Sequence, residues 1–161
     1  MIKRRKLSGK ELSTLRPSLK DRTDLEVHEL CDALKRFTSE YLRSAAELEI
    51  IGQGAATVNI SLEGTAYLLR LLVEYTGESS VLTIKLRISE HMTLECEICD
   101  GPLSFDDLSK IAAAGRNAGF HFEMRGNSFL FRTRLTQLGR VSVYSGETSR
   151  LYTALLEIFF G

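Results

Sequence analysis

Two stretches of alternating apolar and polar residues lie in the middle of this chain, separated by a short polar turn. Apolar side chains alternate with Thr, Lys, Arg and Ser from Leu82 to Ser89, and the alternation resumes from Met92 to Ile98. A period of two places the apolar side chains on one face of a strand. The turn at Ser89-Glu90-His91 joins the two strands, so the sequence predicts an antiparallel hairpin here.

The composition is that of an ordinary globular protein. The 161 residues are 43% hydrophobic and 26% charged, and a chain of this length buries a core without disulfides or a structural metal. The 21 basic and 21 acidic residues give a net charge of +0, which argues against a whole-surface binder of nucleic acid or membrane. No apolar run is long enough to span a bilayer, and three cysteines fit a reducing compartment. We therefore expect a cytoplasmic protein with no membrane partner, and we do not favour a nucleic-acid partner.

The first half of the chain divides into a tail and a helix. Residues 1–22 are basic and weakly periodic, which predicts a flexible tail. From Thr23 onward, apolar residues recur at steps of three and four, which predicts one long helix over 23–51 that Gly52 and Gly54 end. The apolar side chains of this helix extend beyond one stripe, so it either joins two copies in a homodimer or packs against its own sheet.

The remaining patterns predict further strands and helices within a single α/β domain over 23–161. Ser104 and Asp107 resemble a capping box that opens a helix, and Gly119 can close that helix. The fold class is a two-layer α/β sandwich with a mixed sheet. The other expected elements are a strand over 56–62, a helix from Thr65 to Tyr75, a hairpin of Phe120–Met124 and Phe129–Leu135, and a strand and helix within 139–161.

Three motifs between residues 53 and 135 resemble a known family. The helix sequence YLLRLLVEYTGESS, from Tyr67 to Ser80, is similar to the nucleotide-pocket helix of the GHKL superfamily, which includes the ATPase domains of histidine kinases. Ile98-Cys99-Asp100-Gly101-Pro102-Leu103 resembles the strand end that reads adenine in that family, and Leu108 to Leu135 resembles its closing helix and hairpin. The resemblance implies a histidine-kinase ATPase-like (Bergerat-type) core over 53–135.

The chain departs from the family at the positions that would hold Mg–ATP. Tyr67 stands at the position of the base, Leu71 at the metal-binding asparagine, and Glu74 at a phosphate-binding cation. A leucine offers no oxygen to Mg²⁺, a phenol is a poor base near neutral pH, and a carboxylate repels a triphosphate. The second half of the pocket departs as well: Cys99 replaces the adenine-reading aspartate, Leu103 replaces a glycine, and the segment that forms a lid is missing.

Asp100 and Gly101 keep a partial match. They fall on the asparagine and the first glycine of the family's strand end, and a one-residue shift of the alignment would make Asp100 the adenine-reading aspartate. Such a shift turns the side chain to the other face of the strand, so we do not favour it.

These departures predict a vestigial pocket without cofactor, metal or catalytic residues, formed at Tyr67, Leu71, Glu74, Cys99, Asp100, Gly101 and Leu103. We expect Tyr67 and Leu71 to fill it. The resulting hypothesis is a pseudo-ATPase module that binds an unidentified protein partner in signalling.

An alternative hypothesis keeps chemistry. Val27-His28-Glu29-Leu30 resembles the phosphoacceptor box of histidine kinases, so His28 could serve a phosphorelay as a histidine phosphotransferase, although Ala33 replaces the proline of that box. A surface histidine without a role is the competing interpretation.

The cysteine pair Cys96 and Cys99, with His91, is a weaker candidate for zinc. A strand sends the two thiols to opposite faces, and no second C-x-x-C is present, so we expect buried structural thiols.

Overall fold

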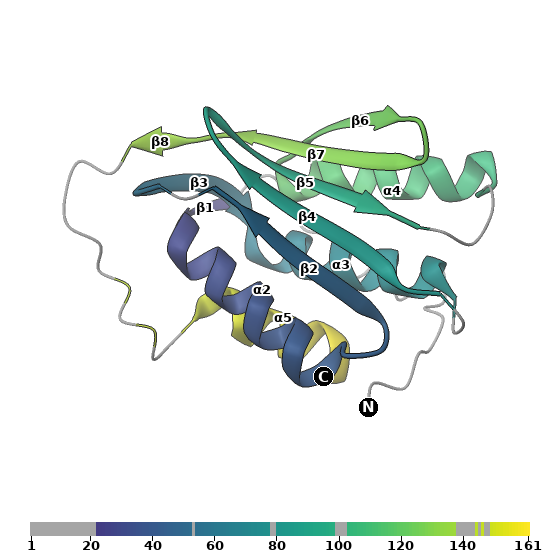
Figure 1. The fold of residues 1–161 in the computed structure, drawn as a ribbon, viewed down its shortest axis with the longest axis horizontal. Helices are drawn as coiled ribbons and strands as arrows, with labels where there is room; N and C mark the ends of the chain where they lie inside the picture. Colours follow the sequence, from purple (N-terminus) through teal and green to yellow (C-terminus); the bar gives the residue numbers. More distant parts are fainter. Residues whose placement is uncertain are drawn as a thin grey trace.

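A five-stranded mixed sheet forms one layer of the molecule, and helices cover one of its faces (Figure 1). The computed structural model describes residues 22–52, 54–77, 80–98, 103–137, 144, 146 and 149–161. Strands β2 and β4 run parallel, whereas the other neighbours in the sheet are antiparallel. The order across the sheet is β2 (Ala46–Ile51), β4 (Leu82–Ile88), β5 (His91–Glu97), β7 (Ser128–Arg134) and β6 (His121–Arg125). The predicted α/β class with a mixed sheet is confirmed.

The central hairpin has the predicted register. β4 pairs with β5 so that Ile84 lies opposite Cys96 and Leu86 opposite Leu94, and all four side chains are buried. Their neighbours on the other face of the hairpin are exposed or half-buried. One face of the sheet therefore meets the helices while the other faces solvent, as the period of two requires.

A second, small sheet was not expected. β3 (Ala56–Ser61) pairs antiparallel with β1 (Arg22–Glu26) on one side and with β8 (Thr136–Gln137) on the other. The expected strand over 56–62 is thus present, but it belongs to this sheet rather than to the large one.

The prediction of one helix over 23–51 is wrong. The segment forms β1, then helix α2 (Val27–Tyr41), then β2. The steps of three and four hold only within α2, where Leu30, Ala33, Leu34 and Phe37 are buried. Beyond it, the run AELEII alternates with a period of two and pairs with β4. Of the two alternatives for this helix, α2 shows the packing of its stripe within its own chain, and the homodimer stays a prediction.

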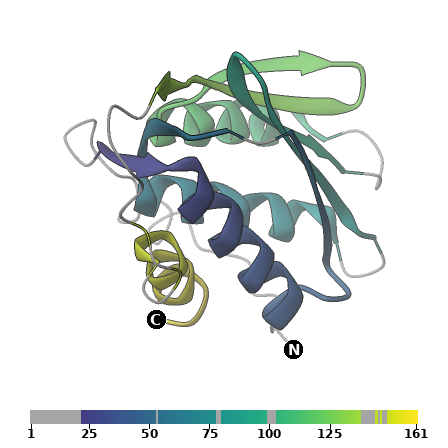
Figure 2. The same cartoon turned by 60° about the vertical axis from the view of Figure 1, so that its left-hand side comes forward.

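Helix α3 (Leu62–Thr76) lies at the centre of the helical layer, between α4 (Phe105–Ala118) and α5 (Arg150–Phe160) (Figure 2). Eleven of its fifteen residues are buried, which explains why its sequence is apolar nearly all round. Helix α5 packs on α2 and α3. The predicted C-terminal helix is confirmed, with Leu151 and Leu155 fully buried.

Helix α4 begins and ends as predicted. The Ser104 Oγ accepts a hydrogen bond from the Asp107 backbone N–H at 3.1 Å, which satisfies one free donor of the first turn. Gly119 ends the helix with φ at 108°, a left-handed conformation that glycine adopts without strain.

The expected tail over 1–22 and the expected strand at Val141 and Val143 lie outside the described residues, except for Arg22, which belongs to β1. Within the described ranges, no helix is long and apolar enough to cross a membrane.

Candidate functional site

The candidate pocket lies along α3, where the sequence placed Tyr67, Leu71 and Glu74. The Tyr67 side chain is 8% exposed and that of Leu71 is 2% exposed, so both belong to the core rather than to an open surface. Leu103, at the far end of the expected pocket, is half-buried and packs against the same core. Cys99, Asp100 and Gly101 lie outside the described residues.

A side-chain bridge links α3 to α4 at this place. The Tyr75 hydroxyl donates a hydrogen bond to the Asp107 carboxylate, in the first turn of α4. Burial raises the pKa of Tyr75 well above its ordinary range, and the charge and hydrogen bond of Asp107 add to the shift. The phenol is protonated at neutral pH and can donate to the Asp107 carboxylate.

The N-terminus of α4 already has its own negative groups. Asp106 and Asp107 lie in its first turn, next to the Ser104 cap. The positive end of a helix dipole attracts a phosphate only while its N–H groups are available. Here the Ser104 hydroxyl accepts from the Asp107 N–H, and the carboxylates of Asp106 and Asp107 add negative charge, so this end disfavours a bound triphosphate.

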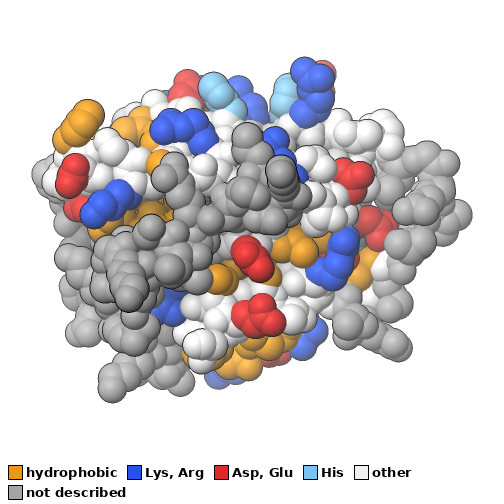
Figure 3. Space-filling model, turned by 180° about the vertical axis from the view of Figure 1, so that it is seen from behind, with side chains coloured by type: hydrophobic (Ala, Val, Ile, Leu, Met, Phe, Trp, Pro, Cys, Tyr) orange, Lys and Arg blue, Asp and Glu red, His pale blue; other side chains and the backbone are white. Residues whose placement is uncertain are grey.

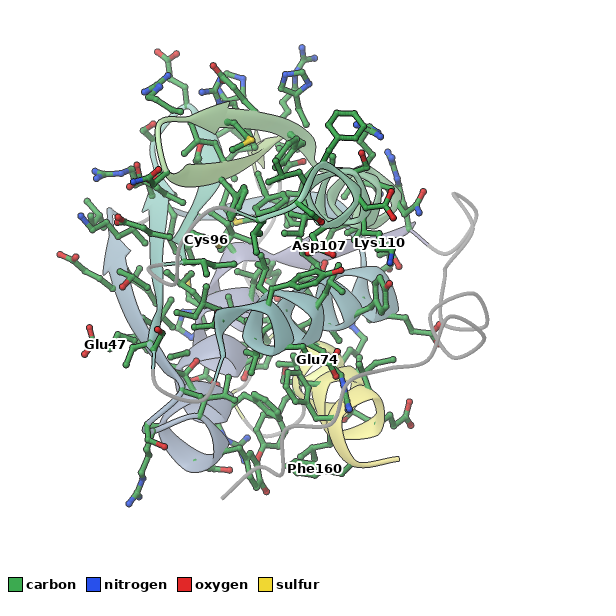
Figure 4. All side chains as sticks on the ribbon, turned by 90° about the vertical axis from the view of Figure 1, so that its right-hand side faces the viewer. Glu47, Glu74, Cys96, Asp107, Lys110 and Phe160 are labelled. Atoms are coloured by element: carbon green, nitrogen blue, oxygen red, sulfur yellow. The ribbon has the colours of Figure 1, made fainter. Side chains whose placement is uncertain are left out.

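Glu74 has a role that the sequence did not reveal. Its Oε1 lies 3.2 Å from the Arg70 Nε, and both side chains are about nine-tenths buried. Arg70 Nη1 also donates to the carbonyl oxygens of Ile158 and Phe159 at 2.9 and 3.0 Å, in the last turn of α5. Glu74 thus neutralises a cation that caps α5, at the junction of α3 and α5 that Figure 4 shows below the label of Glu74.

The opposite end of α5 is held by a second buried charge. The Glu29 Oε2 on α2 accepts a hydrogen bond from the Arg150 backbone N–H at 2.8 Å, and Ser149 caps the same turn. A signal for these contacts was present in the sequence: Glu29 and Arg70 are charges within apolar helix stretches, and buried charges need partners.

His28 is exposed on α2, near the start of the helix. Its ring lies 5.5 Å from that of Tyr144, whose hydroxyl donates to the Asp32 carboxylate. The structure therefore places His28 on a helix that packs within the α/β fold.

The cysteines that the structure describes are buried or partly buried. Burial raises the pKa of the Cys96 thiol to about 12 and that of the Cys31 thiol to about 11. Such thiols are poor nucleophiles and poor metal ligands at neutral pH. Among the described residues, no three His, Cys, Asp or Glu side chains gather in a way that could hold a metal ion.

Basic and histidine side chains gather along the edge of the molecule formed by β6 and β7 (Figure 3). In the sheet register His91 lies opposite Arg134, and His121 lies opposite Arg132. Arg132 faces Glu123 at 3.9 Å, which offsets part of the positive charge. Mixed charges of this kind are common on the solvent face of an antiparallel sheet.

Comparisons with known proteins give similarities to solved structures only. No protein-family model and no curated protein matches this chain. The cytoplasmic segment of histidine kinase QseC is 13% identical, with 84% of this chain and 99% of that chain covered and a TM-score of 0.45. Histidine kinase AdeS of Acinetobacter baumannii is 12% identical, with coverages of 80% and 74% and a TM-score of 0.43. The catalytic domain of histidine kinase ThkA is 14% identical, with coverages of 72% and 97% and a TM-score of 0.43.

These similarities concern the fold. At 12–14% identity they assign no activity, ligand or site residue to this chain. The chemistry of the site depends on the side chains that the chain itself carries.

Proposed function

We propose that this chain is a non-catalytic module of the histidine-kinase ATPase-like type, which acts by binding another protein in a signalling system. The observation that carries the proposal is the burial of Tyr67 and Leu71 on α3. The resemblance places a general base and a metal-binding side chain at these two positions. A buried phenol and a buried isobutyl group can do neither task.

The surroundings of these residues support the same interpretation. Tyr75 and Asp107 join α3 to α4, and the first turn of α4 carries the carboxylates of Asp106 and Asp107 beside the Ser104 cap. Tyr67, Leu71 and Glu74 thus do not fit Mg–ATP, because these three positions supply neither a carboxamide for the metal nor a cation for the phosphates.

An assay of ATP turnover tests the non-catalytic part. The purified full chain is incubated with γ-labelled ATP and Mg²⁺, and both released phosphate and label retained on the chain are measured. We expect neither to exceed the blank without protein. Saturable turnover that is lost in Asp100→Asn would contradict the proposal, because it would make Asp100 the residue that reads adenine.

The phosphotransferase alternative has a separate test. Helix α2 buries its apolar stripe within its own chain, so it does not resemble a free dimerisation helix. Incubation with a phosphorylated response regulator should therefore leave no acid-labile phosphate on the chain. Label that appears on the wild type and not on His28→Ala would establish the alternative instead.

A further inference from the structure

A groove of about 370 Å³ runs between α2 and the edge strand β2, away from the vestigial pocket. Its lining residues come from the second half of α2, the turn that follows it and β2: Lys35, Thr38, Ser39, Arg43, Ala46 and Leu48. Figure 1 shows β2 as the outermost strand of the large sheet, with α2 beside it. The groove thus lies where a helix and a sheet edge meet.

Thr38 gives the groove an unsatisfied polar group. The side chain is 8% exposed, and its Oγ1 has no hydrogen-bond partner among the described residues. A buried hydroxyl without a partner is costly, so native proteins rarely keep one unless a ligand or water completes it. The position of Thr38 in the groove lining indicates where that partner would enter.

The β2 edge supplies backbone groups along the same groove. In the part of the chain that the structure describes, only β4 pairs with β2, so the other edge of β2 presents N–H and C=O groups without a strand partner. Leu48 and Ile50 point toward the helices and are half-buried, which gives an adjoining strand an apolar surface to cover. An extended peptide that pairs with β2 would form hydrogen bonds with these backbone groups and would cover Leu48 and Ile50.

The charges around the edge differ between its two faces. Lys35 and Arg43 are exposed at the groove, and neither forms an ion pair with a described residue. On the opposite face, Glu47 and Glu49 are exposed, and Figure 4 shows Glu47 pointing away from the helices. In a strand added to β2, every second side chain would lie on the groove face beside Lys35 and Arg43. The side chains between them would lie on the opposite face beside Glu47 and Glu49.

This distribution disfavours a second copy of the chain as the occupant. Pairing of β2 with another β2 would bring Glu47 and Glu49 of both copies together on one face, and like charges on adjacent strands are destabilising. A partner with the opposite pattern meets no such repulsion.

We propose that the groove between α2 and β2 binds an extended segment of a partner protein, which adds to β2 with acidic or apolar side chains toward the groove and basic side chains on the outer face. The inference rests on the proposed protein-binding function and names the chemistry of the partner.

A matched pair of synthetic peptides tests it on the full chain. In the first ten-residue peptide, Lys alternates with Glu or Val; the second has the same composition with the lysines in adjacent pairs. We expect the first peptide alone to slow amide exchange at Ala46–Ile51 and to shift the NMR signals of Thr38 and Ser39 in a saturable way.

Three variants locate the contact. The double change Lys35→Glu and Arg43→Glu should weaken binding by about tenfold or more. Lys110→Glu, on exposed α4, is the matched control and should leave binding unchanged. Thr38→Val should weaken binding while making the free protein more resistant to urea, since it removes an unsatisfied hydroxyl without changing the shape of the side chain.

Several results would overturn the inference. These are equal effects of both peptides, the absence of any effect at β2, and unchanged binding by the Lys35 and Arg43 double variant. Protection, without peptide, of the β2 amides on the edge away from β4 would show another occupant: a second copy if light scattering gives a dimer, or another segment of the same chain if it gives a monomer. None of these outcomes depends on ATP, so failure here is distinct from failure of the non-catalytic proposal.

Discussion

Tyr75 and Asp107 form a polar contact between α3 and α4, the two helices of the vestigial pocket. Tyr75→Phe removes the hydroxyl and leaves the ring in place, so it isolates the hydrogen bond. We expect the free energy of unfolding to fall by about 1–2 kcal/mol, measured by urea denaturation, because the Asp107 carboxylate loses its donor.

Asp106→Asn is the matched control for this prediction. Its side chain is exposed in the same turn of α4, so its loss should change the free energy of unfolding by less than about 0.5 kcal/mol. Equal effects of the two substitutions would show that the bridge has no special role in joining α3 to α4.

Cys96 makes stability depend on alkaline pH. Burial raises the pKa of its thiol from the ordinary 9.0 to about 12, so the unfolded chain releases this proton at a lower pH than the folded chain does. The protonated Cys96 thiol therefore makes its full contribution to the free energy of unfolding below pH 9, and this contribution is lost as the pH rises toward 12. Between pH 9.5 and 11, the free energy of unfolding should fall in part because of this group, by up to about 1.4 kcal/mol per pH unit.

Cys96→Val removes this titration and keeps an apolar side chain of similar size. Chemical denaturation of both proteins across this pH range should show a shallower decline for the variant. Tyr75, Tyr144 and Cys31 also have raised pKa values and persist in both proteins, so a decline should remain. Identical slopes would mean that the Cys96 thiol does not titrate as its burial requires.

Among the elements, α5 depends on two buried charges that lie on other helices. Arg70 caps its last turn and Glu29 its first. These two charged groups therefore lie outside the sequence of α5 itself. Arg70→Met should lower the free energy of unfolding by about 3 kcal/mol, because Glu74 loses its cation and two carbonyl groups lose their donor.

Arg87→Met provides the comparison. Arg87 pairs with Glu95 at 3.4 Å on the exposed face of the sheet, where ion pairs contribute about 0–1 kcal/mol. Limited proteolysis should also release α5 sooner from the Arg70 variant than from the Arg87 variant. Equal stability and equal proteolysis of both variants would show that α5 is held by its apolar face alone.

The predicted helix over 23–51 shows where periodicity misleads at the scale of an element. Tyr41, Ala45 and Leu48 continue the spacing of α2 by coincidence, and no glycine or proline marks the end of the helix at Leu42. Residues Ala46–Ile51 form a strand rather than a continuation of the helix because they pair with β4, which lies more than thirty residues further along the chain. The hairpins and α4 were predictable because their turns and caps are local.

At the scale of the whole molecule, the order of elements was largely predictable from the sequence. For the site, the sequence indicated which residues occupy it but not which side chains they contact on neighbouring helices. The position of Tyr67 and Leu71 on a buried helix followed from the apolar character of α3. The α5 carbonyl partners of Arg70 and the α4 partner of Tyr75 did not, because they depend on how those helices pack against α3. The second sheet was missed for the same reason, since β1 and β3 are separated by α2 and β2.

The most direct test of a module without a nucleotide site is titration calorimetry of the full chain with ATP and with ADP, each with and without Mg²⁺. The side chains of Tyr67, Leu71 and Asp107 predict flat isotherms in all four titrations. Saturable binding at micromolar concentration, strengthened by Mg²⁺, would contradict the account and return the chain to the nucleotide-binding kinases.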